Sequence, residues 1–344
     1  MARFTRHRFQ SALTPNGRAC TAVGLIAACL FALAGCGGPD HEPAEPTPEN
    51  PFRVVLQTDW FAQPEHGGFY QALEKGYYRE AGLDVEILEG GPNAMSVQKV
   101  LSRRAHFAMN RADTVMTFAM RGMPVVMVMA TLQHDPQGIL LHADDPAQTI
   151  EDLDGRRVMA VPGLAWIAYV ERKYGITLDI VPHDFGMERF LADPRFIQQC
   201  LVTNEPYYME KHGAEVRVLR LSEAGFNPYH GIYCRRDFAE ARPDIVQRFI
   251  DASIRGWTDF IEGDPAPAFD AIAARNPKMT PDFMAYAHGR LVEDRLVTGF
   301  PERGEAVGRL GPERMRALHD ELHALGILDE RLPLETFFTD EFLR

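Results

Sequence analysis

The sequence predicts an α/β protein of two lobes, joined by a hinge that the chain crosses twice. From Phe52 onward, short apolar runs alternate with helical stretches, a pattern typical of parallel strands joined by crossover helices. A second unit of this kind begins after Gly138, and one more strand is expected at residues 231–234, followed only by helices. The simplest topology places residues 52–137 and 229–344 in lobe one and residues 138–228 in lobe two, with a ligand cleft between them.

The individual elements follow from the apolar periodicity and from glycine or proline at its breaks. In lobe one, strands are expected at residues 53–57, 84–88, 106–109 and 125–131, and helices at 68–75, 94–103 and 113–121. In lobe two, strands are expected at 139–142, 157–161, 179–181, 198–202 and 215–219, and helices at 164–174, 188–193 and 206–212, with a helical turn at 150–153. After the strand at 231–234, helices are expected at 242–262, 266–275, 281–293 and 312–325.

The N-terminus has the features of a lipoprotein signal. Residues 1–20 contain four arginines and no acidic residue, and the apolar run from Thr21 to Ala34 is too short for a comfortable membrane span. Small residues then precede Cys36, which resembles the bacterial lipobox, whose cysteine is acylated. We expect residues 1–35 to be a signal peptide and acylated Cys36 to anchor the exported chain in a lipid bilayer, facing the periplasm or, in a Gram-positive host, the cell surface. The alternative is a plain cleavable signal with an incidental Cys36.

The next segment, residues 36–51, is rich in proline and acidic residues and is expected to be an extended tether. Removing residues 1–35 removes four arginines and changes the formal net charge from −12 to −16, so nucleic acid is not expected as a partner. Only Cys200 and Cys234 remain in the folded part. An exported protein permits a disulfide between them, but their apolar surroundings favour two buried free thiols.

The sequence lacks the common enzyme signatures. It has no phosphate-binding loop, no dinucleotide-binding glycine motif, no H-E-x-x-H motif and no nucleophile elbow. His319 and His323 are spaced as two metal ligands on one helix face, but no third ligand accompanies them. We therefore expect a protein that is not an enzyme, with no cofactor and no metal.

The segment from Gln57 to Tyr70 is the first candidate for ligand binding. It follows the first strand, and ligands of open α/β sheets bind beyond the carboxyl ends of strands. Trp60 and Tyr70 offer flat faces to a ring, Asp59 can accept hydrogen bonds from amino groups, and the amides near His66 suit an anion. The alternatives are structural: Trp60 as a core residue, Asp59 as a helix cap and His66 as a surface residue.

This segment and its continuation resemble the sulfonate-, nitrate- and thiamine-pyrimidine-related periplasmic binding proteins of ABC importers, most closely the thiamine-pyrimidine (hydroxymethylpyrimidine) branch. The similarity is carried by residues 57–70, 72–85, 90–93, 122–126, 133–138 and 152–158. The resemblance implies a type II periplasmic-binding fold, capture of a small heteroaromatic solute and its delivery to a membrane permease. We expect the receptor to act as a monomer.

The resemblance also implies the positions of the binding residues. The lobe-one wall would carry Asp59, Trp60, His66 and Tyr70, with Asn110 and Asp113 at the next strand end, and the lobe-two wall would carry Gly163, Trp166 and Glu205, with Tyr229 where the chain returns. Pro162 and Gly163 are expected to open a helix whose free amides face the cleft. Alternatively, Trp166 belongs to the helix core and Glu205 only adds charge to the first turn of its helix. The expected ligand is an aminopyrimidine that donates to Asp59 and Glu205 and stacks on Trp60.

The sequence also leaves three alternatives to the capture of an aminopyrimidine. A sulfonate or other oxyanion would depend on helix N-termini and on Arg111. A eukaryotic branch of the family makes the pyrimidine from its own histidine and bound pyridoxal phosphate, and His66 stands at the matching position. That branch carries a run of cysteines before the returning strand, whereas residues 225–234 contain only Cys234, so we do not expect a synthase. An interaction module that senses a solute for a membrane partner is the third alternative.

Overall fold

The computed structural model describes residues 45–343. The expected signal peptide and Cys36 lie outside these residues, as does most of the Pro-rich segment. Its last part lies against the first lobe: Pro46 is buried, and its carbonyl oxygen approaches the backbone of Gly82, where φ is +74°. A residue with a Cβ at position 82 would collide with that carbonyl, so glycine permits the close approach.

The first sheet has the strand order β2-β1-β3-β10-β4. Its strands are β1 (Phe52–Gln57), β2 (Leu83–Leu88), β3 (Phe107–Arg111), β4 (Val125–Leu132) and β10 (His230–Arg235). β1 pairs with β2 and β3 in parallel, as expected, but β10 is antiparallel to both β3 and β4. The sequence pattern left the direction of β10 open. This strand inserts between β3 and β4 and runs antiparallel to both, because the chain returns from lobe two at the end of the sheet where β4 finishes.

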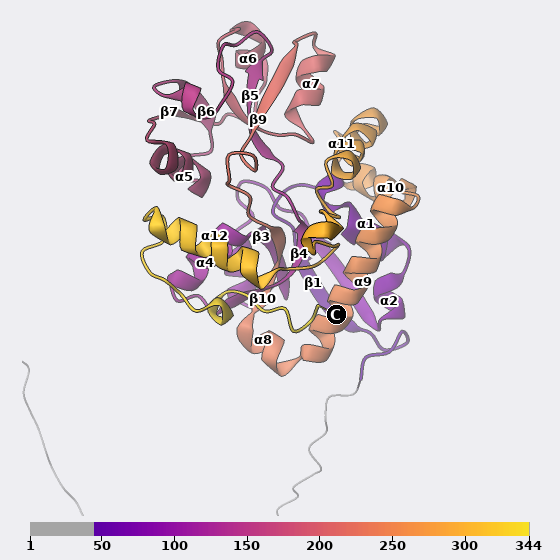
Figure 1. Ribbon diagram of the computed structural model, residues 1–344. Coiled ribbons are helices and arrows are strands. Elements are labelled where there is room, and N and C mark those ends of the chain that lie inside the picture. The colour runs from indigo at the N-terminus through magenta and orange to yellow at the C-terminus, as the bar shows by residue number, and fades with distance from the viewer. Residues whose placement is uncertain (1–44, 344) are drawn as a thin grey trace, which may run out of the picture. The chain divides into compact units, whose positions relative to one another are not determined.

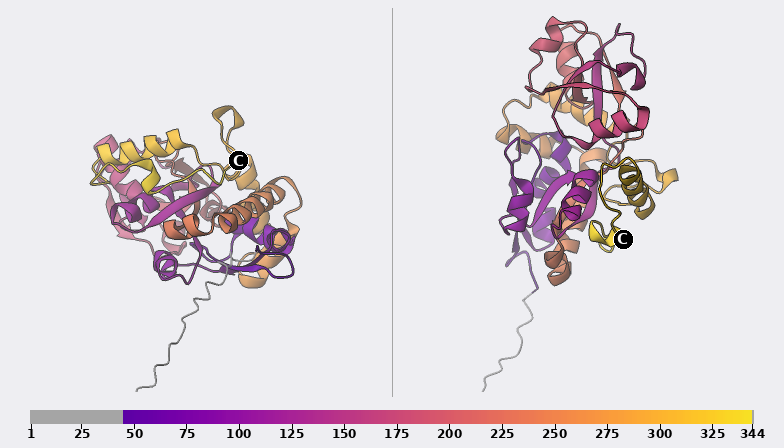
Figure 2. Two further views of the ribbon diagram at one scale, coloured as in Figure 1. Left: turned by 90° about the horizontal axis from the view of Figure 1, so that it is seen from below. Right: turned by 90° about the vertical axis from the view of Figure 1, so that its left-hand side faces the viewer.

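The second sheet has the strand order β7-β6-β8-β5-β9. Its strands are β5 (Gln137–His142), β6 (Arg157–Ala160), β7 (Asp179–Pro182), β8 (Gln198–Leu201) and β9 (Val216–Arg220). β6 is parallel to β7 and β8, whereas β5 is antiparallel to β8 and β9. Both sheets are therefore mixed. In Figure 1 the labelled strands β5, β6, β7 and β9 of this sheet are grouped apart from β1, β3, β4 and β10 of the first. The right-hand view of Figure 2 shows the same separation.

Helices cover both sheets, and we call each sheet with its helices a lobe. Lobe one contains α1 (Gly67–Glu74), α2 (Tyr77–Glu80), α3 (Ser96–Leu101), α4 (Ala112–Met120), α8 (Arg236–Ala241), α9 (Pro243–Glu262), α10 (Ala266–Arg275), α11 (Pro281–Glu293) and α12 (Pro312–Ala324). Lobe two contains α5 (Ala165–Tyr174), α6 (Glu188–Ala192) and α7 (Glu205–Lys211). Short 3₁₀ turns occur at Pro64–His66 (η1), Glu151–Leu153 (η2), Pro301–Arg303 (η3) and Leu334–Thr336 (η4). The sequence patterns do not predict α2 and α8, which are too short to show a helical period.

Lobe one is held together by the packing of α1 against α9. Gly256 of α9 lies so close to α1 that a Cβ at this position would be 2.3 Å from the carbonyl oxygen of Gly68 and 2.5 Å from the side chain of Ala72. The glycines let the two helix backbones approach closely. Trp257, the next residue of α9, is fully buried and fills the space above Gly68.

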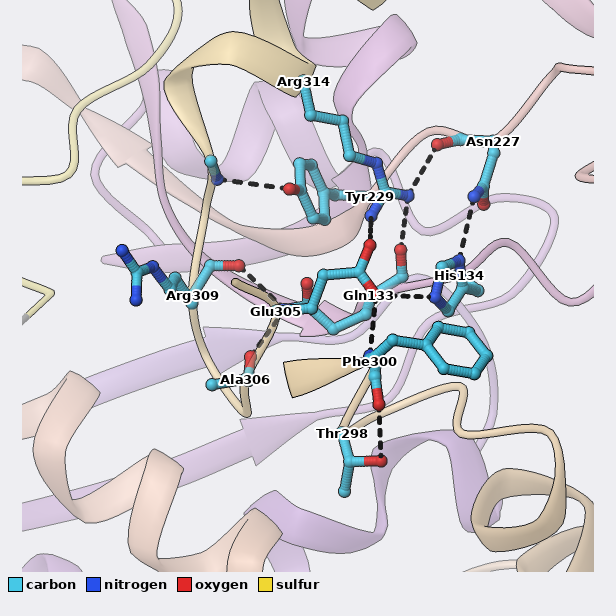
Figure 3. Close-up of polar contacts among 12 residues, drawn as sticks. Gln133, His134, Asn227, Tyr229, Thr298, Phe300, Glu305, Ala306, Arg309 and Arg314 are labelled. Carbon is cyan, nitrogen blue, oxygen red and sulfur yellow. Dashed lines mark hydrogen bonds and ion pairs between the residues drawn. The ribbon is translucent and has the colours of Figure 1, made fainter. Parts of the chain in front are cut away.

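Two chain segments connect the lobes: residues 133–136 leave lobe one and residues 221–229 return to it. Asn227 ties the two together, because its Oδ1 accepts from the backbone amide of Asp135 at 2.8 Å and its Nδ2 lies 2.9 Å from His134 Nδ1. Arg314 of α12 donates to a carbonyl on each segment, those of Gln133 and Asn227 (Figure 3). The C-terminal helix therefore holds both crossings side by side.

Cys200 and Cys234 are both free and buried, which confirms the expectation of two thiols. They cannot pair across the fold, because Cys200 belongs to β8 in the second sheet and Cys234 to β10 in the first. Within residues 45–343, no helix combines the length and apolar character needed to cross a membrane.

Candidate ligand-binding site

Polar residues gather where the strands of the two sheets end toward the crossings, a region we call the interlobe edge. β1, β3 and β4 run toward this edge and β10 starts from it, with His230 paired in register with Arg111. In lobe two, Gln137 starts β5 opposite Leu201 at the end of β8. Residues that follow β1, β3 and β8 in sequence are thereby brought toward one place.

Asp59 and His66 form the first polar pair at this edge. Asp59 Oδ1 lies 2.9 Å from His66 Nε2, and the His66 side chain is almost fully buried. Burial acts to raise the pKa of Asp59, but the hydrogen bond and charge of His66, together with His230, hold it below its usual value. Asp59 is therefore ionised at neutral pH. His66 Nδ1 is buried and has no hydrogen-bond partner among residues 45–343.

Arg111 and Asp113 form a second, more deeply buried pair. The guanidinium of Arg111 donates from Nε at 3.0 Å and from a terminal nitrogen at 3.1 Å to the two oxygens of Asp113. Burial acts to lower the pKa of Arg111, but the charge and hydrogen bond of Asp113 raise it above its usual value. Asp113, one of the predicted ligand-binding residues, directs both carboxylate oxygens to Arg111. Asn110 uses its Oδ1 to accept from the Arg111 backbone amide at 2.9 Å.

Trp60 meets an aromatic ring from each lobe. It contacts its neighbour Phe61 edge-on, with ring centroids 5.6 Å apart, and Phe185 of lobe two at 5.5 Å with an interplanar angle of 41°. Phe185 lies in the loop after β7, is 56% exposed and has a left-handed backbone, with φ at +61°. The sequence reasoning missed Phe185. Its position just after a strand, like that of Trp60, was the available signal.

Tyr70 on α1 is fully buried, and burial raises the pKa of its hydroxyl to about 12. The Arg275 guanidinium lies 5.0 Å from the centroid of its ring. Tyr229 belongs to the crossing network and not to the Asp59 group: its hydroxyl accepts from the Gly311 amide at 3.2 Å, and the Arg314 guanidinium covers its ring at 4.1 Å (Figure 3).

The predicted binding residues of lobe two do not form one group as Asp59 and His66 do. Trp166 is fully buried on α5, and Gly163 is exposed in the loop before that helix, which begins at Ala165. Within the described residues, neither makes a hydrogen bond or an aromatic contact with the lobe-one candidates. Glu205 begins α7 and accepts from the Leu201 amide at 2.7 Å. Burial, with a smaller contribution from Glu65, raises the pKa of Glu205 to about 7.

Glu65 is a further residue that the sequence reasoning missed. It lies beside His66 in η1, is 6% exposed, and accepts a hydrogen bond from the hydroxyl of Thr203 in lobe two. The two residues are 138 positions apart in the chain, so no local pattern announces the contact. Glu65 nevertheless adds a third carboxyl group to the edge that carries Asp59 and Glu205.

Two other places on the molecule are separate from this edge. An open depression on lobe two lies at the opposite end of the second sheet and is lined by His142, Ala143, Asp144, Leu191, Pro194, His212, Gly213, Ala214 and Glu215. His319 and His323 on α12 are each engaged by backbone: His319 Nε2 accepts from the Leu332 amide at 3.1 Å, and His323 Nδ1 lies 3.1 Å from the Leu328 carbonyl. In the described part of the chain, no cluster of three or more His, Cys, Asp or Glu side chains is arranged to hold a metal ion.

The sequence profile described as NMT1/THI5 like matches residues 63–268, which include His66, Tyr70, Arg111 and Glu205. The chain belongs to the NMT1/THI5-like family. This confirms the resemblance stated from the sequence.

The relatives of this NMT1/THI5-like protein include both a binding protein and a synthase. The riboflavin-binding protein RibY of Chloroflexus aurantiacus is 26% identical over 243 residues, covering 66% of each chain. The 4-amino-5-hydroxymethyl-2-methylpyrimidine phosphate synthase of Aspergillus parasiticus is 24% identical over 246 residues, covering 66% of this chain and 72% of that one. The matches thus span about two thirds to three quarters of the relatives' own lengths.

Solved structures confirm the fold class. The periplasmic aliphatic sulphonate binding protein SsuA of Escherichia coli is similar with a TM-score of 0.62 and 14% identity, covering 83% of this chain and 96% of that one. This NMT1/THI5-like chain therefore has the periplasmic-binding-protein fold, built from two mixed α/β sheets.

Proposed function

We propose that this protein is the solute-binding receptor of an ABC importer and captures an amino-bearing nitrogen heterocycle of the aminopyrimidine type. The observation that carries the proposal is the ionised carboxylate of Asp59, held by the buried His66 and followed directly by the partly exposed aromatic ring of Trp60. A carboxylate accepts hydrogen bonds from amino groups, and an aromatic face stacks on a heteroaromatic ring. The family relatives support a heteroaromatic ligand, since one is named for riboflavin and the other for an aminopyrimidine phosphate.

The electrostatics of the interlobe edge favour a hydrogen-bond donor over an oxyanion. Asp59, Glu65 and Glu205 contribute three carboxyl groups, and the guanidinium of Arg111 is paired at two points with the carboxylate of Asp113. An oxyanion needs an uncommitted cation or a set of free amides. The cation expected to serve a sulfonate is already neutralised, so the aminopyrimidine is the better ligand for this edge.

A receptor also fits this chain better than a synthase that would consume His66. The His66 ring is buried and hydrogen-bonded to Asp59, which makes it a positioning group for the carboxylate. The stretch before β10 contains no cysteine run, since residues 225–234 hold only Cys234. We therefore propose a role in capture and delivery, without a chemical step.

A thermal-shift panel tests the proposed ligand class. Aminopyrimidines, thiamine, riboflavin, taurine and nitrate are compared, and a ligand at 100 times its dissociation constant is expected to add about 2.7 kcal/mol of stability. We expect an aminopyrimidine to give the shift and Trp60→Ala to weaken its binding by about fivefold, because stacking contributes about 1 kcal/mol. Phe61→Ala, which removes a half-exposed ring from the same segment, is the control. A clear shift with taurine or nitrate and none with any aromatic compound would contradict the proposal.

We further propose that the receptor is exported and held at a membrane by lipid on Cys36. Radiolabelled palmitate is expected to enter the full-length protein in its host and to be absent from a Cys36→Ser variant. Equal labelling of the two proteins would refute the anchor.

A further inference from the structure

Glu65 joins the two lobes at the interlobe edge. Its backbone belongs to η1 of lobe one, and its Oε1 accepts a hydrogen bond from the hydroxyl of Thr203, two residues beyond the end of β8 in lobe two. Both side chains are buried, Thr203 completely. The contact is thus shielded from water. In such a buried environment, a hydrogen bond to a carboxyl group contributes more to stability than it does at the surface.

The second oxygen of Glu65 is uncommitted. Oε2 is buried and has no hydrogen-bond partner within the described residues 45–343. A buried carboxyl oxygen without a partner costs free energy, so such an atom marks a place where a partner is expected. The Thr203 contact shows that the side chain is fixed, because one oxygen is already held.

The neighbours of Glu65 are the groups already proposed to bind the solute. Asp59 and His66 both act electrostatically on Glu65, and Glu65 acts on Glu205 of lobe two. The geometry agrees with this proximity, because Glu65 directly precedes His66 in η1 and its partner Thr203 stands two residues before Glu205 at the start of α7. Burial, with a smaller contribution from Asp59, raises the pKa of Glu65 above its usual value, although Thr203 and His66 oppose the shift.

We propose that Glu65 is a specificity-determining residue of the binding site: its Oε2 accepts a hydrogen bond from the amino group of the bound heterocycle while its Oε1 holds Thr203 of lobe two. The inference rests on the proposed function, because it requires a solute with an N–H donor. The inference adds to that function a single carboxyl group, Glu65, that both recognises the amino group of the solute and contacts the second lobe. A ring of the same shape without the amino group leaves Oε2 unpartnered and binds more weakly.

The test compares two ligands and two isosteric variants by titration calorimetry. The ligands are 4-amino-5-hydroxymethyl-2-methylpyrimidine and the same pyrimidine without its amino group. Glu65→Gln keeps the shape and an acceptor for Thr203 but places an N–H₂ group where Oε2 was. Thr203→Val keeps the shape and removes only the hydroxyl. Circular dichroism and melting temperature establish that each variant is folded.

We expect Glu65→Gln to weaken binding of the aminopyrimidine by about 10- to 100-fold, the range for a hydrogen bond to a charged group, and to change binding of the deaminated ring by less than about threefold. Thr203→Val is expected to weaken both ligands by the same factor, because it alters only the contact between the lobes. Equal weakening of both ligands by Glu65→Gln would show that Glu65 merely holds the lobes together and would overturn the inference. So would unchanged binding of the aminopyrimidine to this variant. Either result leaves the proposed function standing, since the wild-type protein would still bind the ring.

Discussion

Replacing Arg111 with methionine is expected to destabilise the protein by about 3–5 kcal/mol, the usual cost of removing one partner from a buried ion pair. Asp113 is 2% exposed and spends both oxygens on Arg111, so the variant leaves a buried carboxyl group without its partner. Urea denaturation measures the loss as a lower transition midpoint with an unchanged slope. The double variant Arg111→Met, Asp113→Asn is expected to recover much of the stability, because the stranded charge is gone.

The exposed ion pair of Arg53 and Glu86 supplies the matched control. Its N–O distance of 2.6 Å is shorter than those in the Arg111 pair, but the side chains are 70% and 45% exposed. Arg53→Met is therefore expected to cost at most about 1 kcal/mol. If Arg111→Met were no more destabilising than Arg53→Met and abolished binding of taurine or nitrate, Arg111 would be an oxyanion ligand and not a structural cation.

The second large effect is expected at Gly256. Gly256→Ala places a methyl group 2.3 Å from the backbone oxygen of Gly68, which cannot move aside without shifting α1. Overpacking of this kind costs about 1–3 kcal/mol, and Tyr70, a predicted binding residue on α1, would move with the helix. Chemical denaturation measures the loss in free energy of unfolding. The solute affinity of the folded variant shows whether the shift of α1 disturbs binding.

Gly289 of α11 is the matched position for this experiment. It is also a glycine inside a helix, but a Cβ there meets nothing within 4 Å. Gly289→Ala is expected to stabilise the protein by about 0.4–1 kcal/mol, because alanine loses less backbone entropy on folding. Similar changes at the two positions would mean that α1 and α9 are not closely packed through Gly256.

Apart from the short helices α2 and α8, the sequence predicts the helices and strands of this fold, because these elements are long enough to show an apolar pattern. It does not predict the direction of β5 and β10. Periodicity reports which residues face a core, but it carries no information on whether a strand enters its sheet from one end or the other. Both strands run against their neighbours because each begins where the chain has just crossed between the lobes.

The contacts of the candidate site also fall into those that the sequence predicts and those that it does not. Asp59 and His66 are seven residues apart, so a single segment with its strand and turn signals is enough to place them together. Arg111 and Asp113 are even closer in sequence, but the sequence alone cannot show that they neutralise each other instead of serving a ligand. The contacts of Glu65 with Thr203 and of Trp60 with Phe185 join distant segments and depend on how the two lobes meet.

The position of α12 has a consequence for the rate at which a solute is captured. Glu321 of this helix binds Tyr169 and Lys173 of α5 at 2.7 and 2.9 Å, while Arg314 of the same helix holds both crossings. Glu65, the proposed contact with the solute, is 6% exposed, so under the proposed function a solute would gain access only when such contacts separate. Opening would then limit the association rate, and the same barrier would slow escape. The proposed receptor would therefore capture its solute slowly and hold it for a long time.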